Sequence, residues 1–172
     1  MKTIQKFALA TGLIAFAALP SGAQYNGLPD TGTYFIVNAE SGEALEPGGP
    51  SAGQNVFAQE YKKGGVQKWV ITRKIDPVTK KPNNRYEIKL AGEADGLNFQ
   101  PHPVIGSATA IISTDKSVFE LAVAEAGGYY IKSVKRNGDA LFTAPQPPMP
   151  TEVKFGPVDS SAKFRWAFDR AD

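Results

Sequence analysis

The chain repeats one short pattern three times. An aromatic-x-Ile sequence recurs at intervals of 52 and 43 residues, beginning at Tyr34, Tyr86 and Tyr129. A large aromatic residue closes each copy, again at similar intervals of 50 and 47 residues, at Trp69, Phe119 and Trp166. Such periods are typical of supersecondary units that bury their apolar faces against one another. The chain is therefore expected to build one body from three copies of a motif.

The first residues have the pattern of a secretory signal. Lys2 and Lys6 precede an apolar run over 7–19, and small residues follow at Ser21–Ala23. This run of thirteen residues is shorter than the roughly 20 apolar residues that cross a bilayer as a helix. We therefore predict a signal peptide over 1–23, a secreted, extracellular protein, and a single domain over 24–172.

Charge and cysteine content narrow the classes of partner. Without Lys2 and Lys6 the chain has 17 basic and 17 acidic residues, so its formal charge is near zero. Such a balance gives no long-range attraction to nucleic acid or to an anionic membrane, and neither is expected as a partner. The chain contains no cysteine, which excludes disulfides, thiol nucleophiles and Cys-ligated metal sites.

The secondary-structure signals after Gln24 are those of short strands. Aromatic and β-branched runs occur at 34–37, 69–72, 86–90, 110–113, 118–123, 129–132, 152–155 and 164–168. Turn-forming residues separate them, and Asn137-Gly138 is the sharpest such signal because two-residue hairpin turns favour this dipeptide. The pattern predicts an all-β domain.

Aligning the three copies gives four strand positions in each. The repeats run roughly over 30–76, 83–125 and 127–170. The alignment equates one apolar residue on the second strand of each unit, at Leu45, Leu97 and Leu141. It then places Glu46, Asn98 and Phe142 at the next position. Three units that each leave an apolar face uncovered can close into a barrel with few free strand edges.

These residues resemble the β-trefoil, and within it the ricin-B-type lectin domain. The resemblance is strongest in the first unit, in Ile36-Val37-Asn38, Ser41-Gly42-x-x-Leu45 and Gln67-x-Trp69. It implies a trefoil of three pseudo-repeats with four strands each. The closing aromatics are then expected to fill the barrel, because large rings dominate core packing. Trefoils carry unrelated activities, so function depends on the site.

The resemblance also implies a shallow sugar pocket in the first unit. Ricin-B-type sites combine an acidic residue after the second-strand Leu, a ring that stacks on the sugar, and polar residues beside Gln-x-Trp. The matching residues here are Glu46, Gln59, Tyr61 and Gln67. Val66 stands where the family has Asn, and Phe164 replaces the glutamine in the third unit. At most one pocket, in the first unit, is expected to bind sugar; the alternative is an ordinary polar surface.

A proline-rich segment suggests a second class of function. The third unit resembles secreted fungal trefoil protease inhibitors of the mycocypin and serine-inhibitor type in having such a segment before its last strands. The segment consists of Pro145, Gln146, Pro147, Pro148, Met149 and Pro150. Prolines fix φ and restrict the preceding residue, so an extended, stiff loop is expected. A stiff loop loses little entropy on entering a protease cleft.

Enzymatic readings have less support. His102 is the only histidine, and no nucleophile motif accompanies it. A lone histidine without cysteine is also a poor metal anchor. A carboxylate pair for glycoside hydrolysis is defined by spatial separation and stays open at this point. We expect no catalytic residue, metal or cofactor. The predicted protein is a secreted, monomeric binding module for a glycan or glycoprotein, or alternatively for a protease.

Overall fold

The computed structural model describes residues 27–92, 96–104, 107–147 and 149–171, and the predicted signal peptide lies outside these ranges. Within the described ranges the chain forms twelve strands, three short 3-10 turns and no α-helix. The all-β prediction is confirmed. The first four strands are β1 (Gly32–Asn38), β2 (Ala44–Pro47), β3 (Val56–Gln59) and β4 (Lys68–Ile75).

The remaining strands follow in two further groups. The second group is β5 (Pro82–Leu90), β6 (Asn98–Pro101), β7 (Ala110–Ser113) and β8 (Phe119–Val123). The third is β9 (Tyr129–Ser133), β10 (Ala140–Gln146), β11 (Met149–Gly156) and β12 (Trp166–Arg170). The 3-10 turns are η1 (Gly65–Gln67), η2 (Val134–Arg136) and η3 (Ala162–Phe164). We refer to β1–β4, β5–β8 and β9–β12 as units 1, 2 and 3.

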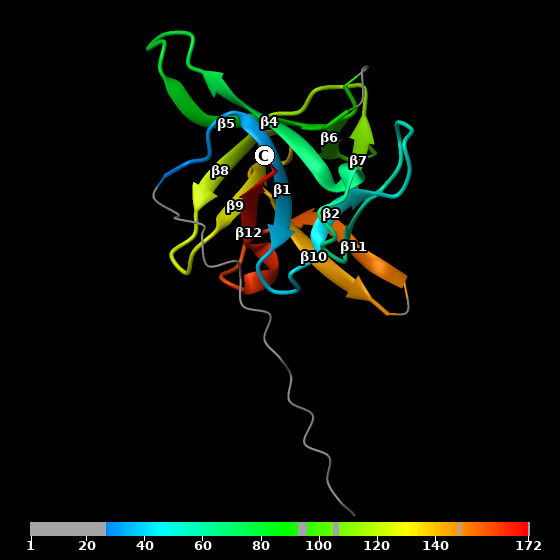
Figure 1. The fold of residues 1–172 in the computed structure, drawn as a ribbon. Helices are drawn as coiled ribbons and strands as arrows, with labels where there is room; N and C mark the ends of the chain where they lie inside the picture. The colour runs from blue at the N-terminus through cyan, green and yellow to red at the C-terminus, as the bar shows by residue number, and fades with distance from the viewer. Residues whose placement is uncertain (1–26, 93–95, 105–106, 148, 172) are drawn as a thin grey trace, which may run out of the picture.

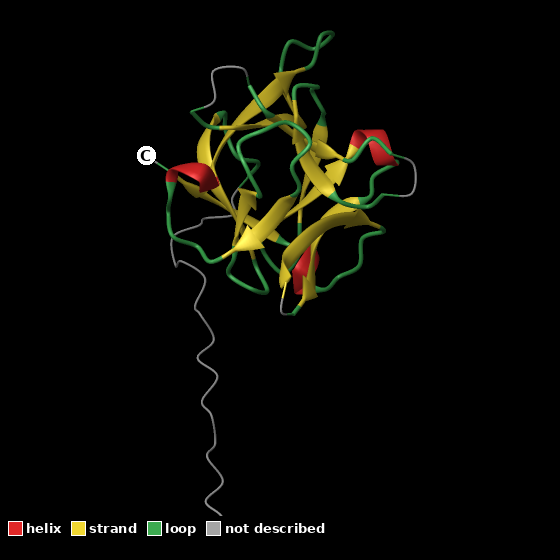
Figure 2. Ribbon diagram, turned by 90° about the vertical axis from the view of Figure 1, so that its right-hand side faces the viewer, coloured by secondary structure: helices red, strands yellow, loops and turns green. Residues whose placement is uncertain are grey.

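Strand pairing repeats with threefold regularity. The first strand of each unit pairs with the second and fourth strands of its own unit and with the fourth strand of another: β1 with β12, β5 with β4 and β9 with β8. Six strands thereby close a ring, in the order β1, β4, β5, β8, β9 and β12. Figure 2 shows the strands surrounding a common centre.

The other six strands form three hairpins, β2–β3, β6–β7 and β10–β11. These hairpins also touch one another. β11 pairs with β3, and isolated bridges join Asn55 to Ile111 and Thr109 to Lys154. The hairpins therefore form a second closed circuit, and few strand edges stay free.

Large rings fill the centre, as the sequence predicts. In the register of the barrel Tyr34 lies opposite Trp69, Tyr86 opposite Phe119, and Tyr129 opposite Trp166. All three closing aromatics are fully buried. The two tryptophans donate their indole N–H to carbonyls on equivalent strands, Trp69 to Leu45 at 3.0 Å and Trp166 to Leu141 at 2.9 Å. Each buried indole N–H thus has a partner.

The three repeated tyrosines share a further role. Their hydroxyls donate to backbone carbonyls of one short segment, 27–30: Tyr34 to Asp30 at 3.1 Å, Tyr86 to Pro29 at 2.8 Å and Tyr129 to Gly27 at 2.5 Å. Leu28 from the same segment packs against the core. One tyrosine from each unit therefore ties segment 27–30 to the barrel.

The alignment of the second unit needs a correction. Val37 pairs with Ala44 and Lys89 with Asn98, so Asn98 is the equivalent of Ala44. The residue equivalent to Leu45 is therefore Phe99, not Leu97. The connection from β5 to β6 is two residues longer than that from β1 to β2, and surface connections tolerate such changes. An alignment by residue count therefore matches each β2 residue with a residue of unit 2 that lies two positions too early in the chain.

The proline-rich segment of unit 3 also differs from the prediction. It is the tip of the β10–β11 hairpin rather than a loop, because Pro145 and Gln146 end β10 and β11 begins at Met149. Gln146 pairs with Met149 across the turn. The backbone is extended, as expected, but main-chain pairing rather than proline alone fixes it.

The turn at Asn137-Gly138 is only partly as predicted. Both residues have positive φ, at 51° and 87°, as this dipeptide allows. β9 nevertheless ends at Ser133 and β10 begins at Ala140, with η2 between them. The connection is therefore longer than a two-residue hairpin turn. Its 3-10 turn lies beside unit 2, where Lys135 contacts Gln100.

Candidate functional site

In unit 1 the structure joins two of the predicted site residues directly. Gln67 ends η1 and is almost completely buried, at 1% exposure. Its amide nitrogen donates to Glu46 Oε2 at 2.9 Å and to the Glu60 carbonyl at 2.8 Å, while its oxygen accepts the Lys62 N–H at 3.0 Å. Since both amide hydrogens are used, Gln67 orients the Glu46 carboxylate and the connection before η1 rather than offering donors to a ligand.

Glu46 lies on the outer face of the β2–β3 hairpin. It pairs with Phe57, and Gln59 pairs with Ala44 two residues away on the same face. Within the described residues the second carboxylate oxygen of Glu46 has no protein partner. A half-buried ring and an oriented carboxylate therefore stand side by side on this face. Strand alternation back from Gln59 could have identified Phe57, which sequence reasoning missed.

Tyr61, the predicted stacking ring, packs against the small cluster of Phe35, Val37 and Ala44. It packs on Phe35 of β1 with ring centroids 5.3 Å apart, and its hydroxyl donates to the Asp169 carboxylate of β12. The Lys63 ammonium lies 5.6 Å from the ring centroid. Burial, then the hydrogen bond and the negative charge of Asp169, raise the pKa of Tyr61. In this arrangement the ring has Phe35 and Lys63 as protein neighbours.

The corrected register shows what replaces the Glu46–Gln67 pair in the other units. Counting along the matched strands equates Glu46 with Gln100 and Phe142, and Gln67 with Ser117 and Phe164. The members of each pair touch in every unit. Ser117 Oγ lies 3.4 Å from Gln100 Oε1, and the rings of Phe142 and Phe164 have centroids 4.9 Å apart. The backbone positions of the pair are thus kept, while its side chains change from carboxylate and amide to amide and hydroxyl to two phenyl rings.

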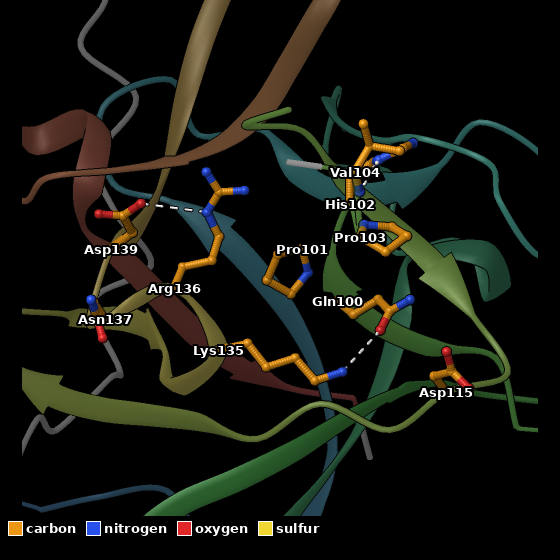
Figure 3. Close-up of a pocket in the computed structure, with 10 residues that line it drawn as sticks. All are labelled: Gln100, Pro101, His102, Pro103, Val104, Asp115, Lys135, Arg136, Asn137 and Asp139. Carbon is orange, nitrogen blue, oxygen red and sulfur yellow. Dashed lines mark hydrogen bonds and ion pairs between the residues drawn. The ribbon is translucent and has the colours of Figure 1, made fainter. Parts of the chain in front are cut away.

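Unit 2 has an open pocket beside Gln100, which is the equivalent of Glu46 in unit 1. The pocket encloses about 790 Å³, and one wall comes from β6 and the residues after it. The opposite wall comes from the β9–β10 connection of unit 3 (Figure 3). Its lining residues are Gln100, Pro101, His102, Pro103, Val104, Asp115, Lys135, Arg136, Asn137 and Asp139. The sequence placed the expected pocket in unit 1 and did not anticipate this one.

The tip of the β10–β11 hairpin extends away from the barrel (Figure 1). Met149 is 66% exposed, and Pro145, Pro147 and Pro150 are exposed as well. Pro148, also part of the predicted interaction segment, lies outside the described residues. The tip is thus a narrow, apolar projection on a paired β-ribbon.

Two further features bear on the chemistry open to the described part of the chain. Among the described residues, no group of three His, Asp or Glu side chains is placed to hold a metal ion. No helix within the described ranges has the length and apolarity to span a membrane.

No protein-family model and no curated protein sequence matches this chain. Solved structures do match it. The agglutinin of Rhizoctonia solani superposes with a TM-score of 0.69 at 19% identity, over 84% of this chain and 97% of the agglutinin.

Two other structures show the same likeness. The ricin B-like lectin of Macrolepiota procera, solved in complex with lactose, gives a TM-score of 0.63 at 18% identity, covering 84% of this chain and 99% of the lectin. ThreeFoil, a designed threefold-symmetric protein, gives 0.66 at 18% identity, covering 80% of this chain and 97% of the design. The chain has the β-trefoil fold of ricin-B-type lectins.

Proposed function

We propose that this protein is a secreted, monomeric, non-catalytic module that binds a glycan or glycoprotein through unit 1. The observation that carries the proposal is the Glu46 carboxylate, which Gln67 orients on the outer face beside Phe57. The lactose complex of the Macrolepiota lectin gives a precedent for sugar binding on this fold. The signal-like pattern over 1–23 supports export.

The chemistry of the pair suits a pyranose. A sugar ring presents hydroxyl donors on one edge and a C–H face that packs on aromatic rings. A carboxylate accepts two hydroxyl hydrogens in strong, charge-assisted bonds, and its position must be fixed for these to be selective. Gln67 supplies that fixation from the buried side, while Gln59 adds an amide on the same face.

The same contacts support the non-catalytic part of the proposal. One oxygen of Glu46 is occupied by an amide, and its cross-strand neighbour is a phenyl ring. His102 accepts the Val104 N–H through Nδ1 at 3.2 Å and has no nucleophile in hydrogen-bond contact within the described residues. Among the described residues around Glu46 and His102, no acid, base and nucleophile lie in mutual contact.

A glycan array tests the proposal with one matched pair of variants. Glu46→Gln keeps the shape of the side chain and removes its charge, whereas Glu40→Gln makes the same change at an exposed position of the β1–β2 turn. The wild-type protein and Glu40→Gln should bind the same glycans, with competition by free sugar. Glu46→Gln should lose at least about tenfold in affinity, as expected when a charge-assisted hydrogen bond is removed. Equal binding by both variants would remove unit 1 as the site.

The exposed hairpin tip favours a second candidate function, protease inhibition. A paired ribbon that presents Met149 could enter a cleft with little loss of entropy. Inhibition of a trypsin-, subtilisin- or papain-like protease should disappear when 145–150 is replaced by Gly and Ser residues, and should persist in Glu46→Gln. Failure to inhibit any of the three proteases would dismiss this candidate.

A further inference from the structure

The pocket of unit 2 is built around a buried amide whose direction is fixed. Gln100 is only 3% exposed, and its oxygen accepts from Ser117 Oγ at 3.4 Å and from Lys135 Nζ at 3.5 Å. An ammonium group can only donate, so the oxygen of Gln100 must face Lys135. The amide nitrogen then points away from these partners. Within the described residues it has none, and Gln100 lines the pocket.

Positive groups lie beside this amide on the wall from unit 3. Lys135 forms no ion pair with any residue in the described ranges, and Figure 3 shows its side chain reaching toward Gln100. Arg136 is held in place, since its Nε lies 3.4 Å from Asp139 Oδ2 and another guanidinium nitrogen donates to the Ser107 carbonyl. The salt bridge neutralises Asp139. The uncompensated charge on this wall is therefore the ammonium of Lys135.

The other side of the pocket has a different character. Asp115 is exposed and lies on the far side of Gln100 from Lys135 (Figure 3). A carboxylate there accepts hydroxyl hydrogens. His102 accepts the Val104 N–H at Nδ1, so its other nitrogen carries a hydrogen in the neutral ring. Pro101 and Pro103 contribute apolar surface. The pocket thus has a cationic donor end and an acceptor end, separated by apolar wall.

We propose that this pocket binds an acidic saccharide, a chain containing uronic acid. The sugar carboxylate accepts from Lys135 Nζ, the Gln100 amide nitrogen donates to a neighbouring ring hydroxyl, and further hydroxyls reach Asp115 at the other end. About 790 Å³ is ample for more than one sugar ring and falls within the range of about 300–1,000 Å³ usual for small-molecule sites. The inference rests on glycan binding as the class of function, but it does not require the unit 1 site.

Calorimetry with two matched probes tests this site. Trigalacturonate and galactotriose differ by a carboxylate in place of a hydroxymethyl group on each ring. The wild-type protein should bind trigalacturonate at least about tenfold more tightly, because the carboxylate adds charge-assisted hydrogen bonds. Equal affinity for the two probes, or no measurable binding of trigalacturonate, would overturn the proposal.

Three variants locate the binding. Lys135→Gln, at an exposed position, should weaken trigalacturonate binding at least about tenfold, whereas Lys81→Gln, an exposed lysine outside the pocket lining, should change it less than about twofold. Equal losses would indicate unspecific charge attraction and contradict the site. Glu46→Gln should leave trigalacturonate binding intact. Loss of trigalacturonate binding in Glu46→Gln would instead assign the acidic sugar to unit 1. If only the unit 1 proposal is wrong, Glu46→Gln will bind neutral glycans as the wild-type protein does, while the results with trigalacturonate stay as expected.

Discussion

Units 1 and 3 are alike inside the barrel and opposite outside it. Inside, Trp69 and Trp166 occupy matching positions, are equally buried, and donate to equivalent carbonyls. Outside, the carboxylate–amide pair of unit 1 corresponds to Phe142 and Phe164 in unit 3, where the Lys163 ammonium lies 5.4 Å and 5.2 Å from the two ring centroids. The same backbone carries a polar site in one unit and an apolar cluster in the other.

The difference shows which constraints the fold imposes. Interior residues must fill a closed volume and satisfy buried N–H groups, so the units converge there. The outer pair only has to be mutually compatible, and amide with carboxylate, hydroxyl with amide, and ring with ring all meet that condition. Function can therefore change in one unit without altering the barrel.

The largest expected effect tests the interior equivalence. Trp69→Ala and Trp166→Ala should each lower the free energy of unfolding by about 3–5 kcal/mol, because each leaves a cavity and an unpaired carbonyl. Chemical denaturation measures this, with Val78→Ala as a control at an 85% exposed position that should change stability by less than about 0.5 kcal/mol. A small loss at only one tryptophan would break the comparison.

The outer pair of unit 3 should matter for stability alone. Phe164 is 3% exposed and packs on Phe142, so Phe164→Ala should cost about 3 kcal/mol in the free energy of unfolding. Glycan affinity, measured below the unfolding transition, should be unchanged. A parallel loss of affinity would mean that unit 3 contributes to sugar binding.

The outer pair of unit 1 should matter for both stability and binding. Gln67→Leu keeps the bulk of the side chain but leaves the Lys62 N–H and the Glu60 carbonyl without this partner, at a cost of about 1–3 kcal/mol. Glycan affinity should fall at least about tenfold, because Glu46 loses its fixed orientation. Calorimetry on the folded variant separates the two effects, and retained affinity would show that Gln67 is only structural.

The smallest effect concerns the tyrosines common to all units. Burial raises the pKa of Tyr86 to about 12 from its ordinary value of 10.0, so its neutral form is favoured in the folded protein. This contribution to stability is complete below pH 10 and is lost as the pH rises toward 12. Tyr86→Phe should lose about 1 kcal/mol at neutral pH through the bond to Pro29 and show a shallower alkaline decline. Identical alkaline slopes in denaturation would contradict this.

The sequence predicted the buried residues of the barrel more completely than the residues on its surface. The spacing of Trp69, Phe119 and Trp166 indicated buried, equivalent rings, because a repeated large aromatic in a strand pattern leaves few alternatives. Through the resemblance it also placed Glu46 and Gln67 in one predicted site, and the two side chains are hydrogen-bonded in the structure. It missed Gln100, because the connection between β5 and β6 is two residues longer than its counterpart and the count shifted. The position of Phe57 beside Glu46 and the neighbours of Tyr61 likewise depend on which strands are adjacent in the folded chain.

The sequence by itself determined the strand-rich composition, the threefold repeat and the large rings that must leave water. The tertiary structure alone decided which polar groups become neighbours, as when β9–β10 brings Lys135 to Gln100, 35 residues away. The physical reason is that burial depends on local periodicity and residue type, whereas a polar site depends on register between distant strands. Register shifts with every change in connection length.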